Sequence, residues 1–243
     1  MLSVDSNYSR REYFVEESFD NYIQDIVDLT ESTNRENKDK GIIISGAIPS
    51  CDVVHQQRIK DALYAISKEV FRRNGKIIFG SHPTFQPLIF DTAKNVLKDE
   101  YKDSVNMYIS KYFKSSYDLD ELMQNSNVYE CDVVGNLSSS LTNMRKQMIN
   151  DSCGQALICI GGKTKVENQN PGLDEEIELA IARGIPVFII GSAGGRAAEL
   201  AVQYDNENWI CNINNLTPDE NKELMVSLDY NFITTKILDH LNI

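Results

Sequence analysis

The chain has 243 residues, 42% of them hydrophobic, which is enough for the core of one α/β domain with a short appendage. Its formal net charge is -12 without a long basic run, which argues against a nucleic acid as the main ligand. No apolar run reaches the ~18 residues of a membrane span, and the N-terminus lacks the apolar core of a secretory signal. Five scattered cysteines without a Cys-x-x-Cys motif favour a reduced, cytoplasmic compartment, and the dispersed histidines predict no metal site.

Residues 1–40 are expected to form an appendage. Apolar residues between Phe19 and Leu29 recur at helical spacing, and a polar, charged stretch follows from Thr30 to Lys40. We expect a helix that docks on the main domain; a contact with a second copy or another protein is the alternative reading. The main domain is predicted to span residues 41–243.

From residue 41 onward, short apolar runs alternate with amphipathic segments. We expect strands at 41–46, 76–79, 105–112, 128–131, 156–160 and 186–190, with helices at 52–73, 85–97, 117–124, 137–149, after Gly172, after Gly195 and at 230–241. An edge strand is expected at 209–211, and Thr217 is expected to cap a further helix. This alternation predicts an α/β fold, a Rossmann-like three-layer sandwich with a mostly parallel sheet.

Four of the predicted strands end in small residues. The pairs and runs are Ser45-Gly46, Gly80-Ser81, Gly161-Gly162 and Gly191 to Gly195. One glycine after a strand is usually only a turn, but glycine also lets the backbone approach a ligand, and the N–H groups at a helix start can hold phosphate. Four such loops at the carboxyl ends of one sheet favour a crevice for a nucleotide-type ligand. The P-loop and the dinucleotide fingerprint are both absent from the sequence.

Three basic residues near these loops are candidate phosphate partners. Lys163 follows a Gly-Gly turn, Arg145 lies on a predicted helix, and Arg196 begins a helix, where a cation opposes the helix dipole. A solvated lysine and an ordinary salt bridge are the simpler readings of Lys163 and Arg145. His82, just before a proline, has either a structural role or a contact with a phosphate or a base.

Glu175 and Glu176 are the candidate carboxylates. Acidic residues are common in a first helical turn for electrostatic reasons alone. Their functional reading is a hydrogen bond to ribose hydroxyls, or stabilisation of an oxocarbenium-like centre at a ribosyl carbon.

Four blocks of the sequence together resemble one known family. They are Phe79–Leu88 (FGSHPTFQPL), Ser140–Met148 (SLTNMRKQM), Ile160–Thr164 (IGGKT) with Pro171–Glu176 (PGLDEE), and Gly191–Arg196 (GSAGGR). Their order and spacing resemble the SLOG superfamily, the Rossmann-like group that includes the "lonely guy" phosphoribohydrolases, the DNA-processing protein Smf and sensor domains of bacterial defence systems.

The sensor-type SLOG domains found with TIR and Sir2-type proteins in antiphage systems are the most similar. This resemblance implies a ligand of the ADP-ribose or cyclic ADP-ribose type, with Arg145, Lys163 and Glu176 as contacts, and a homo-oligomer or an effector protein as partner. The enzymatic branch carries Pro-Gly-Gly-x-Gly-Thr-x-x-Glu, whose Gly-Gly-x-Gly-Thr core is missing here.

The expected function is therefore binding of a nucleotide-derived small molecule without a further cofactor. The alternative is an enzyme that cleaves a nucleotide N-glycosidic bond, in a phosphoribohydrolase or deoxyribosyltransferase-like reaction. The predicted ligand-binding residues are Ser45, Gly46, Gly80, Ser81, His82, Arg145, Gly161, Gly162, Lys163, Glu176, Gly191, Gly194, Gly195 and Arg196. Glu175 and Glu176 would be catalytic only in an enzyme.

Overall fold

The computed structural model describes residues 24, 37–164 and 171–243. Most of the predicted appendage, residues 1–40, therefore lies outside the described residues, and its docking and its boundary at residue 41 stay predictions. No helix within the described ranges has both the length and the apolar character needed to cross a bilayer.

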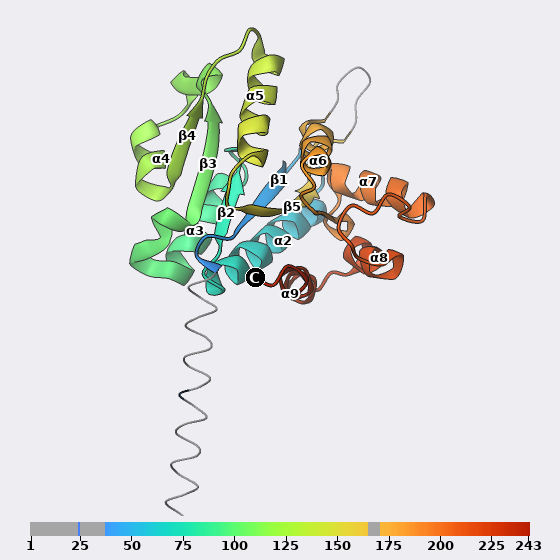
Figure 1. Ribbon diagram of the computed structural model, residues 1–243. Coiled ribbons are helices and arrows are strands. Elements are labelled where there is room, and N and C mark those ends of the chain that lie inside the picture. The colour runs from blue at the N-terminus through green and yellow to red at the C-terminus, as the bar shows by residue number, and fades with distance from the viewer. Residues whose placement is uncertain (1–23, 25–36, 165–170) are drawn as a thin grey trace, which may run out of the picture.

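One sheet of six parallel strands forms the centre of the described fold (Figure 1). The strands are β1 (Gly41–Ala47), β2 (Lys76–Phe79), β3 (Val105–Ser110), β4 (Asn127–Cys131), β5 (Gly154–Gly161) and β6 (Val187–Ile190). All five pairings are parallel, and the strand order is β4-β3-β2-β1-β5-β6. The predicted Rossmann-like α/β fold is confirmed.

The strand order places a topological switch between β1 and β5. The chain runs outward from β1 to β4 and then returns through helix α5 (Leu137–Ile149) to pair β5 with the free side of β1. The connections after β1 and after β5 therefore leave the sheet in opposite directions, and a crevice opens at the carboxyl ends of these strands.

Helices cover both faces of the sheet. Helices α2 (Val53–Arg72), α3 (Gln86–Leu97) and α9 (Tyr230–His240) contribute to the hydrophobic core on one face. Helices α5, α6 (Gly172–Ala182) and α7 (Gly195–Asn206) contribute to the core on the other face. Shorter elements complete the chain: η1 (Lys98–Ser104), η2 (Lys111–Ser116), α4 (Leu119–Asn125), η3 (Gly191–Ala193) and α8 (Pro218–Val226).

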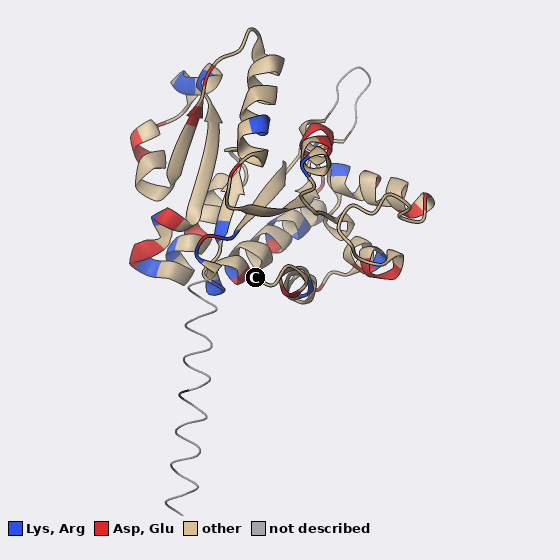
Figure 2. Ribbon diagram, viewed as in Figure 1, with Lys and Arg blue, Asp and Glu red and all other residues tan. Residues whose placement is uncertain are grey.

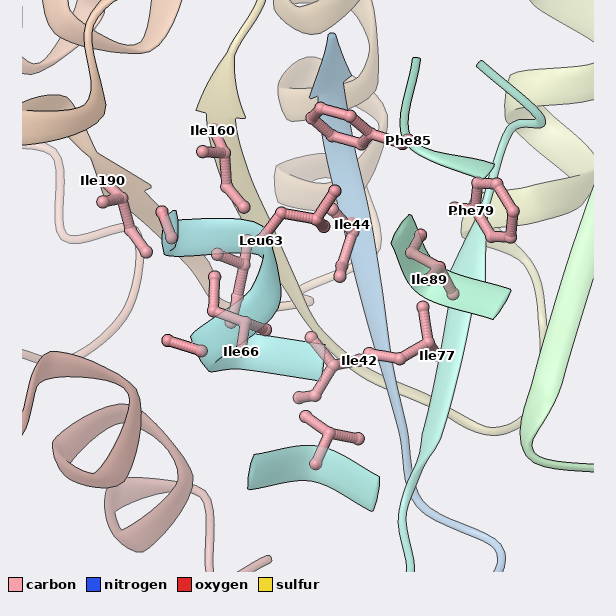
Figure 3. Close-up of a cluster of buried hydrophobic side chains, with 14 of the residues drawn as sticks. Ile42, Ile44, Leu63, Ile66, Ile77, Phe79, Phe85, Ile89, Ile160 and Ile190 are labelled. Carbon is pink, nitrogen blue, oxygen red and sulfur yellow. The ribbon is translucent and has the colours of Figure 1, made fainter. Parts of the chain in front are cut away.

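The two cores explain the continuous apolar runs of the strands. In β1, Ile42 and Ile44 pack with Leu63 and Ile66 of α2, as Figure 3 shows, whereas Ile43 belongs to the opposite core. All three isoleucines are at most 2% exposed. Because side chains alternate between faces along a strand, a strand buried on both faces needs apolar residues at every position.

The predicted strand at 105–112 is shorter in the structure. β3 ends at Ser110, whose side chain accepts a hydrogen bond from the Tyr112 backbone N–H at 3.3 Å and so starts the η2 turn. All six residues of β3 are buried, including the polar Asn106, which donates to Asp151 at 3.0 Å. The alternation of apolar and polar residues thus reflects a buried polar contact and not a solvent-exposed face.

The predicted edge strand at 209–211 is wrong. Asn208 and Trp209 both have φ of 52°, which is outside the strand region, and the Trp209 ring stacks on Tyr204 with centroids 5.5 Å apart. A short irregular segment borders β6 instead: the Val187 N–H donates to the Ile213 carbonyl at 2.8 Å, and the Asn214 side chain donates to the Val187 carbonyl at 2.9 Å.

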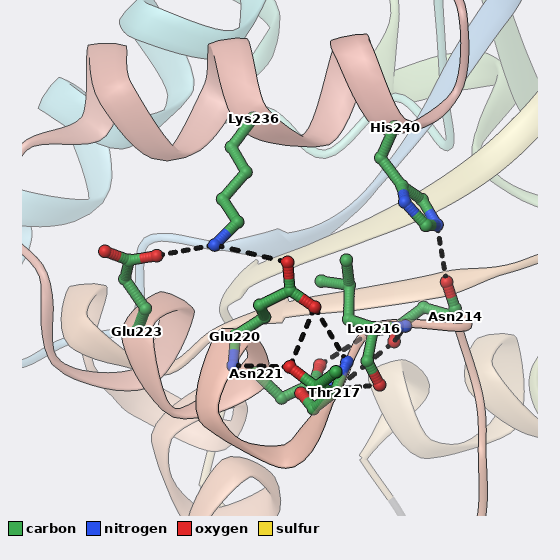
Figure 4. A network of polar contacts seen from close by, with 8 residues as sticks. All are labelled: Asn214, Leu216, Thr217, Glu220, Asn221, Glu223, Lys236 and His240. Atoms are coloured by element: carbon green, nitrogen blue, oxygen red, sulfur yellow. Dashed lines mark hydrogen bonds and ion pairs between the residues drawn. The ribbon is translucent and has the colours of Figure 1, made fainter.

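The C-terminal helices are held by a polar network (Figure 4). Thr217 is the N-cap of α8, as predicted, and forms a capping box with Glu220. Lys236 of α9 makes ion pairs with Glu220 and Glu223, and a His240 ring nitrogen bonds the Asn214 carbonyl at 3.0 Å. A capping side chain of this type stabilises a helix by about 1 kcal/mol, so the cap fixes the start of α8 while the ion pairs tie α9 to it.

Candidate functional site

A cavity of about 740 Å³ lies at the carboxyl ends of β1, β2 and β5, at the switch point. Its lining contains nine of the predicted ligand-binding residues: Ser45, Gly46, Gly80, Ser81, His82, Arg145, Gly162, Lys163 and Glu176. The lining does not include Gly161, Glu175, Gly191, Gly194, Gly195 or Arg196. Three of the four predicted glycine loops therefore meet at one cavity, and the fourth packs behind it.

The end of β1 shapes the floor of the cavity. Gly46 has φ of 147°, and a Cβ atom there would collide with the Ile160 carbonyl of β5, so only glycine fits. Ser45, just before it, is 1% exposed, and its hydroxyl has no hydrogen-bond partner among the described residues. The same hydroxyl lies beside the Glu176 carboxylate and helps to lower the pKa of that group, although burial outweighs its effect. The Ser45 hydroxyl at the cavity floor therefore lies near Glu176 but makes no hydrogen bond of standard geometry with the described residues.

An arginine and two glutamates cross the gap between α5 and α6. Arg145 Nη1 lies 2.5 Å from Glu175 Oε2, and Arg145 Nε lies 3.3 Å from Glu176 Oε1. Figure 2 shows acidic residues on α6 and a basic band on α5. Gly172, the first residue of α6, leaves room for the guanidinium, because a Cβ atom there would collide with it. A larger residue at the start of α6 would require the end of the Arg145 side chain to shift.

The two glutamates have different surroundings. Both carboxylate oxygens of Glu175 are engaged, one by Arg145 and the other by the Thr142 hydroxyl at 2.5 Å. Glu176 lines the cavity with a side chain that is 12% exposed. Burial raises the pKa of Glu176, although Arg145 and Ser45 act in the opposite direction. Of the two candidate carboxylates, Glu176 alone is placed to meet a ligand.

Lys163, unlike Arg145, has no carboxylate partner among the residues that the structure describes. It is exposed and follows Gly162, which has φ of 87°. No ion pair joins Lys163 to any residue in the described ranges, whereas Arg145 is held by two carboxylates. Lys163 is therefore the side chain best able to pair with an anionic group.

The loop after β2 presents Ser81 and His82 to the cavity. Ser81 has φ of 55°, unusual for a residue with a side chain, and its hydroxyl lies 3.3 Å from the Tyr117 hydroxyl. His82 Nδ1 lies 2.9 Å from the Thr84 hydroxyl. Burial, with a smaller effect of the Lys163 charge, lowers the pKa of His82, so this imidazole is neutral at pH 7. The loop thus offers polar groups without adding charge.

Arg196 supports the site from behind. Its guanidinium donates to both Asp174 oxygens at 2.9 and 2.8 Å and to Glu199 at 2.8 Å. Its backbone N–H donates to the Gly162 carbonyl at 3.1 Å, which fixes the loop that precedes Lys163. Arg196 is 8% exposed and outside the cavity lining, so its contacts are structural, and a ligand role for it stays a prediction that the geometry does not favour.

An apolar wall completes the cavity, and the sequence patterns did not identify it. Phe113 and Tyr117 come from η2 and the turn after it, and Leu137, Leu141 and Met144 come from α5. The spacing of the three α5 residues was a usable signal, since positions four and three apart share a helix face. The η2 residues carry no motif that would have identified them.

The parallel sheet and the cavity at its switch point define a protein of the Rossmann-like α/β class. Over residues 51–216 the sequence matches the SLOG cluster3 family, and the chain belongs to this family. No curated protein matches the sequence. The X-ray structure of TM1055, a Northeast Structural Genomics Consortium target, is similar at 15% identity and a TM-score of 0.47, covering 67% of this chain and 81% of its own.

Proposed function

We propose that the protein binds a nucleotide-derived small molecule of the ADP-ribose or cyclic ADP-ribose type in the cavity at the carboxyl ends of β1, β2 and β5. The main observation is that one cavity of about 740 Å³ combines Lys163, which has no ion pair within residues 37–164 and 171–243, with the largely buried carboxyl group of Glu176 and an apolar wall. Small-molecule sites usually enclose roughly 300–1,000 Å³, so a dinucleotide-sized ligand fits the volume.

Each part of such a ligand has a matching group in the lining. Lys163 suits a phosphate, because a charge-assisted contact needs a cation that is not already paired. Glu176 and the Ser45 hydroxyl beside it suit ribose hydroxyls, which both donate and accept hydrogen bonds. Phe113 and Tyr117 suit the flat face of a base, since aromatic rings stack favourably.

We further propose that the protein is a sensor in nucleotide signalling or bacterial antiphage defence, acting in the cytoplasm. Membership of the SLOG cluster3 family and the resemblance to sensor-type domains support this role. Its output would come from self-association or from an effector protein that responds to the bound ligand.

Cleavage of a nucleotide N-glycosidic bond, by a phosphoribohydrolase or deoxyribosyltransferase-like reaction, is the second candidate. The observation in its favour is the largely buried Glu176, because a carboxyl group with a raised pKa holds a proton that it can deliver to the leaving group as a general acid. The missing Gly-Gly-x-Gly-Thr core weighs against it.

One experiment separates the two functions. The pure protein is incubated with AMP, NAD, ADP-ribose and cyclic ADP-ribose isomers, and the melting temperature and the products are measured in the same samples. We expect an ADP-ribose-type ligand to raise the melting temperature and to be recovered unchanged. Release of a base or nicotinamide that Glu176→Gln abolishes would instead establish the enzyme.

The site assignment is tested with Lys163→Ala. Loss of one charge-assisted phosphate contact should cost about 2 kcal/mol, or roughly thirtyfold in affinity for ADP-ribose measured by calorimetry. Lys146→Ala is the matched control, because Lys146 is an exposed lysine outside this cavity. Equal affinity of the wild-type protein and Lys163→Ala would remove Lys163 from the site.

A further inference from the structure

The hydrogen bonds of His82 fix which of its ring nitrogens carries the proton. The Thr84 backbone N–H points at His82 Nδ1, with nitrogens 3.4 Å apart, and the Thr84 hydroxyl lies 2.9 Å from the same atom. The hydroxyl oxygen also accepts the Ile48 backbone N–H at 3.1 Å, and its own hydrogen is available to donate to Nδ1. A nitrogen that accepts from an N–H cannot itself be protonated, so Nδ1 has the lone pair.

The proton of the neutral ring must then lie on Nε2. Burial and the positive charge of Lys163, in the loop after β5, both disfavour a second proton on the ring. Phe85 packs edge-on against the imidazole, with centroids 6.4 Å apart, and limits its rotation. Among the described residues no hydrogen-bond partner of Nε2 is found, while His82 lines the cavity. The free nitrogen is therefore a donor available to a ligand.

We propose that Thr84 fixes His82 as the Nε2–H tautomer, so that His82 donates a hydrogen bond to an anionic oxygen of the ligand beside Lys163. In this arrangement Thr84 is a positioning residue and His82 a specificity-determining residue. A neutral donor next to a lysine selects phosphate oxygens and rejects amino groups, because two donors cannot bond each other. The identity of the ligand rests on the proposed function, whereas the tautomer does not.

The tautomer is measured directly by ¹⁵N NMR of the imidazole nitrogens without ligand. The chain has three histidines, so single substitutions of His55 and His240 assign the signals. We expect the wild-type His82 to show an unprotonated Nδ1 and a protonated Nε2 at neutral pH. A protonated Nδ1 in the wild-type protein would overturn the inference.

The role of Thr84 is tested with a matched pair of substitutions. Thr84 is exposed, so both Thr84→Val and Thr84→Ser should fold. Thr84→Ser keeps both the hydroxyl and the backbone N–H and should keep the wild-type spectrum, whereas Thr84→Val keeps only the backbone N–H, the longer contact at 3.4 Å, and should raise the share of the Nδ1–H tautomer. The same tautomer ratio in Thr84→Val as in the wild-type protein would show that the Thr84 hydroxyl does not hold the ring in this tautomer.

The donor role is tested by titration with ADP-ribose. The amide nitrogen of His82→Gln can occupy the place of Nε2, so this variant should bind within about threefold of wild type, while the shorter His82→Asn should bind about tenfold more weakly. Wild-type binding with no loss in either variant would overturn the inference and leave the proposed function standing. Failure of the wild-type protein to bind ADP-ribose would overturn the ligand role of His82 together with the proposed function, while the NMR result would still decide the tautomer.

Discussion

Two arginines of this protein have the same type of partner and different roles. Arg145 of α5 and Arg196 of α7 both form ion pairs with carboxylates from the first turn of α6, and both side chains are at most 17% exposed. Only Arg145 lines the cavity. Three consecutive acidic residues, Asp174, Glu175 and Glu176, thus take part in two different clusters. The cluster with Arg145 lines the cavity, and the cluster with Arg196 is structural.

The geometry of the two clusters explains the difference. Arg196 donates to both oxygens of the Asp174 carboxylate, the bidentate geometry that holds a guanidinium most firmly. These hydrogen bonds raise the pKa of Arg196. Arg145 divides its contacts between Glu175 and Glu176, and the longer one, 3.3 Å, goes to the cavity residue Glu176. Successive residues of an α-helix point about 100° apart, so the turn that holds Asp174 behind the site directs Glu176 into it.

The largest expected effect tests the structural cluster. Arg196→Ala leaves Asp174 without its bidentate partner, and we expect a loss of about 3 kcal/mol in the free energy of unfolding measured with urea. Arg72→Ala is the control: its side chain is 63% exposed, and the change should stay within about 0.5 kcal/mol. A loss in Arg196→Ala no greater than in the control would contradict the structural reading of this cluster.

The second effect concerns the space beside Arg145. Gly172→Ala forces a methyl group against the guanidinium, and we expect a loss of about 1–2 kcal/mol in unfolding free energy. The strain needs the arginine, so the same substitution should cost much less in an Arg145→Ala background. Strictly additive free energies in this double-mutant cycle would show that the two residues do not interact.

The third effect is the pH dependence caused by Glu176. Burial raises the folded-state pKa of this group above the ordinary 4.5, so the folded protein holds the proton more tightly than the unfolded chain. The stability of wild type relative to Glu176→Gln should therefore decrease as the pH rises from about 4.5 through the folded pKa. Urea unfolding of both proteins across this window measures the difference, and an increase with pH would refute the assigned direction.

The smallest expected effect on stability is that of Lys163→Ala. The described residues give Lys163 no ion pair, so its removal should change the unfolding free energy by less than about 0.5 kcal/mol. The same variant should bind ADP-ribose roughly thirtyfold more weakly, so Lys163 would contribute to ligand binding and not to stability. A clear loss of stability in Lys163→Ala would instead show that Lys163, like Arg196, has a structural role.

The sequence predicted the sheet and helices because burial on both faces leaves an apolar signature, as in β1 and β6. It also placed Lys163, His82 and Glu176 at one crevice, because parallel strands end at the same edge. It could not distinguish Arg145 from Arg196, since the partner of each depends on helix rotation and packing. The strand expected at 209–211 failed for a similar reason: stacking of Trp209 on Tyr204 outweighs local β-propensity.

The pairing of β1 with β5 has a consequence for how the protein folds. Ile42 pairs with Ala156, so the seam beneath the cavity joins segments that are far apart in the chain, and contacts of this kind form slowly. The cavity therefore cannot exist before the return crossover has docked. A ligand can therefore bind, and stabilise the protein, only after β1 and β5 have paired. The rate at which ligand binding is recovered during refolding would then report how fast the sheet is completed.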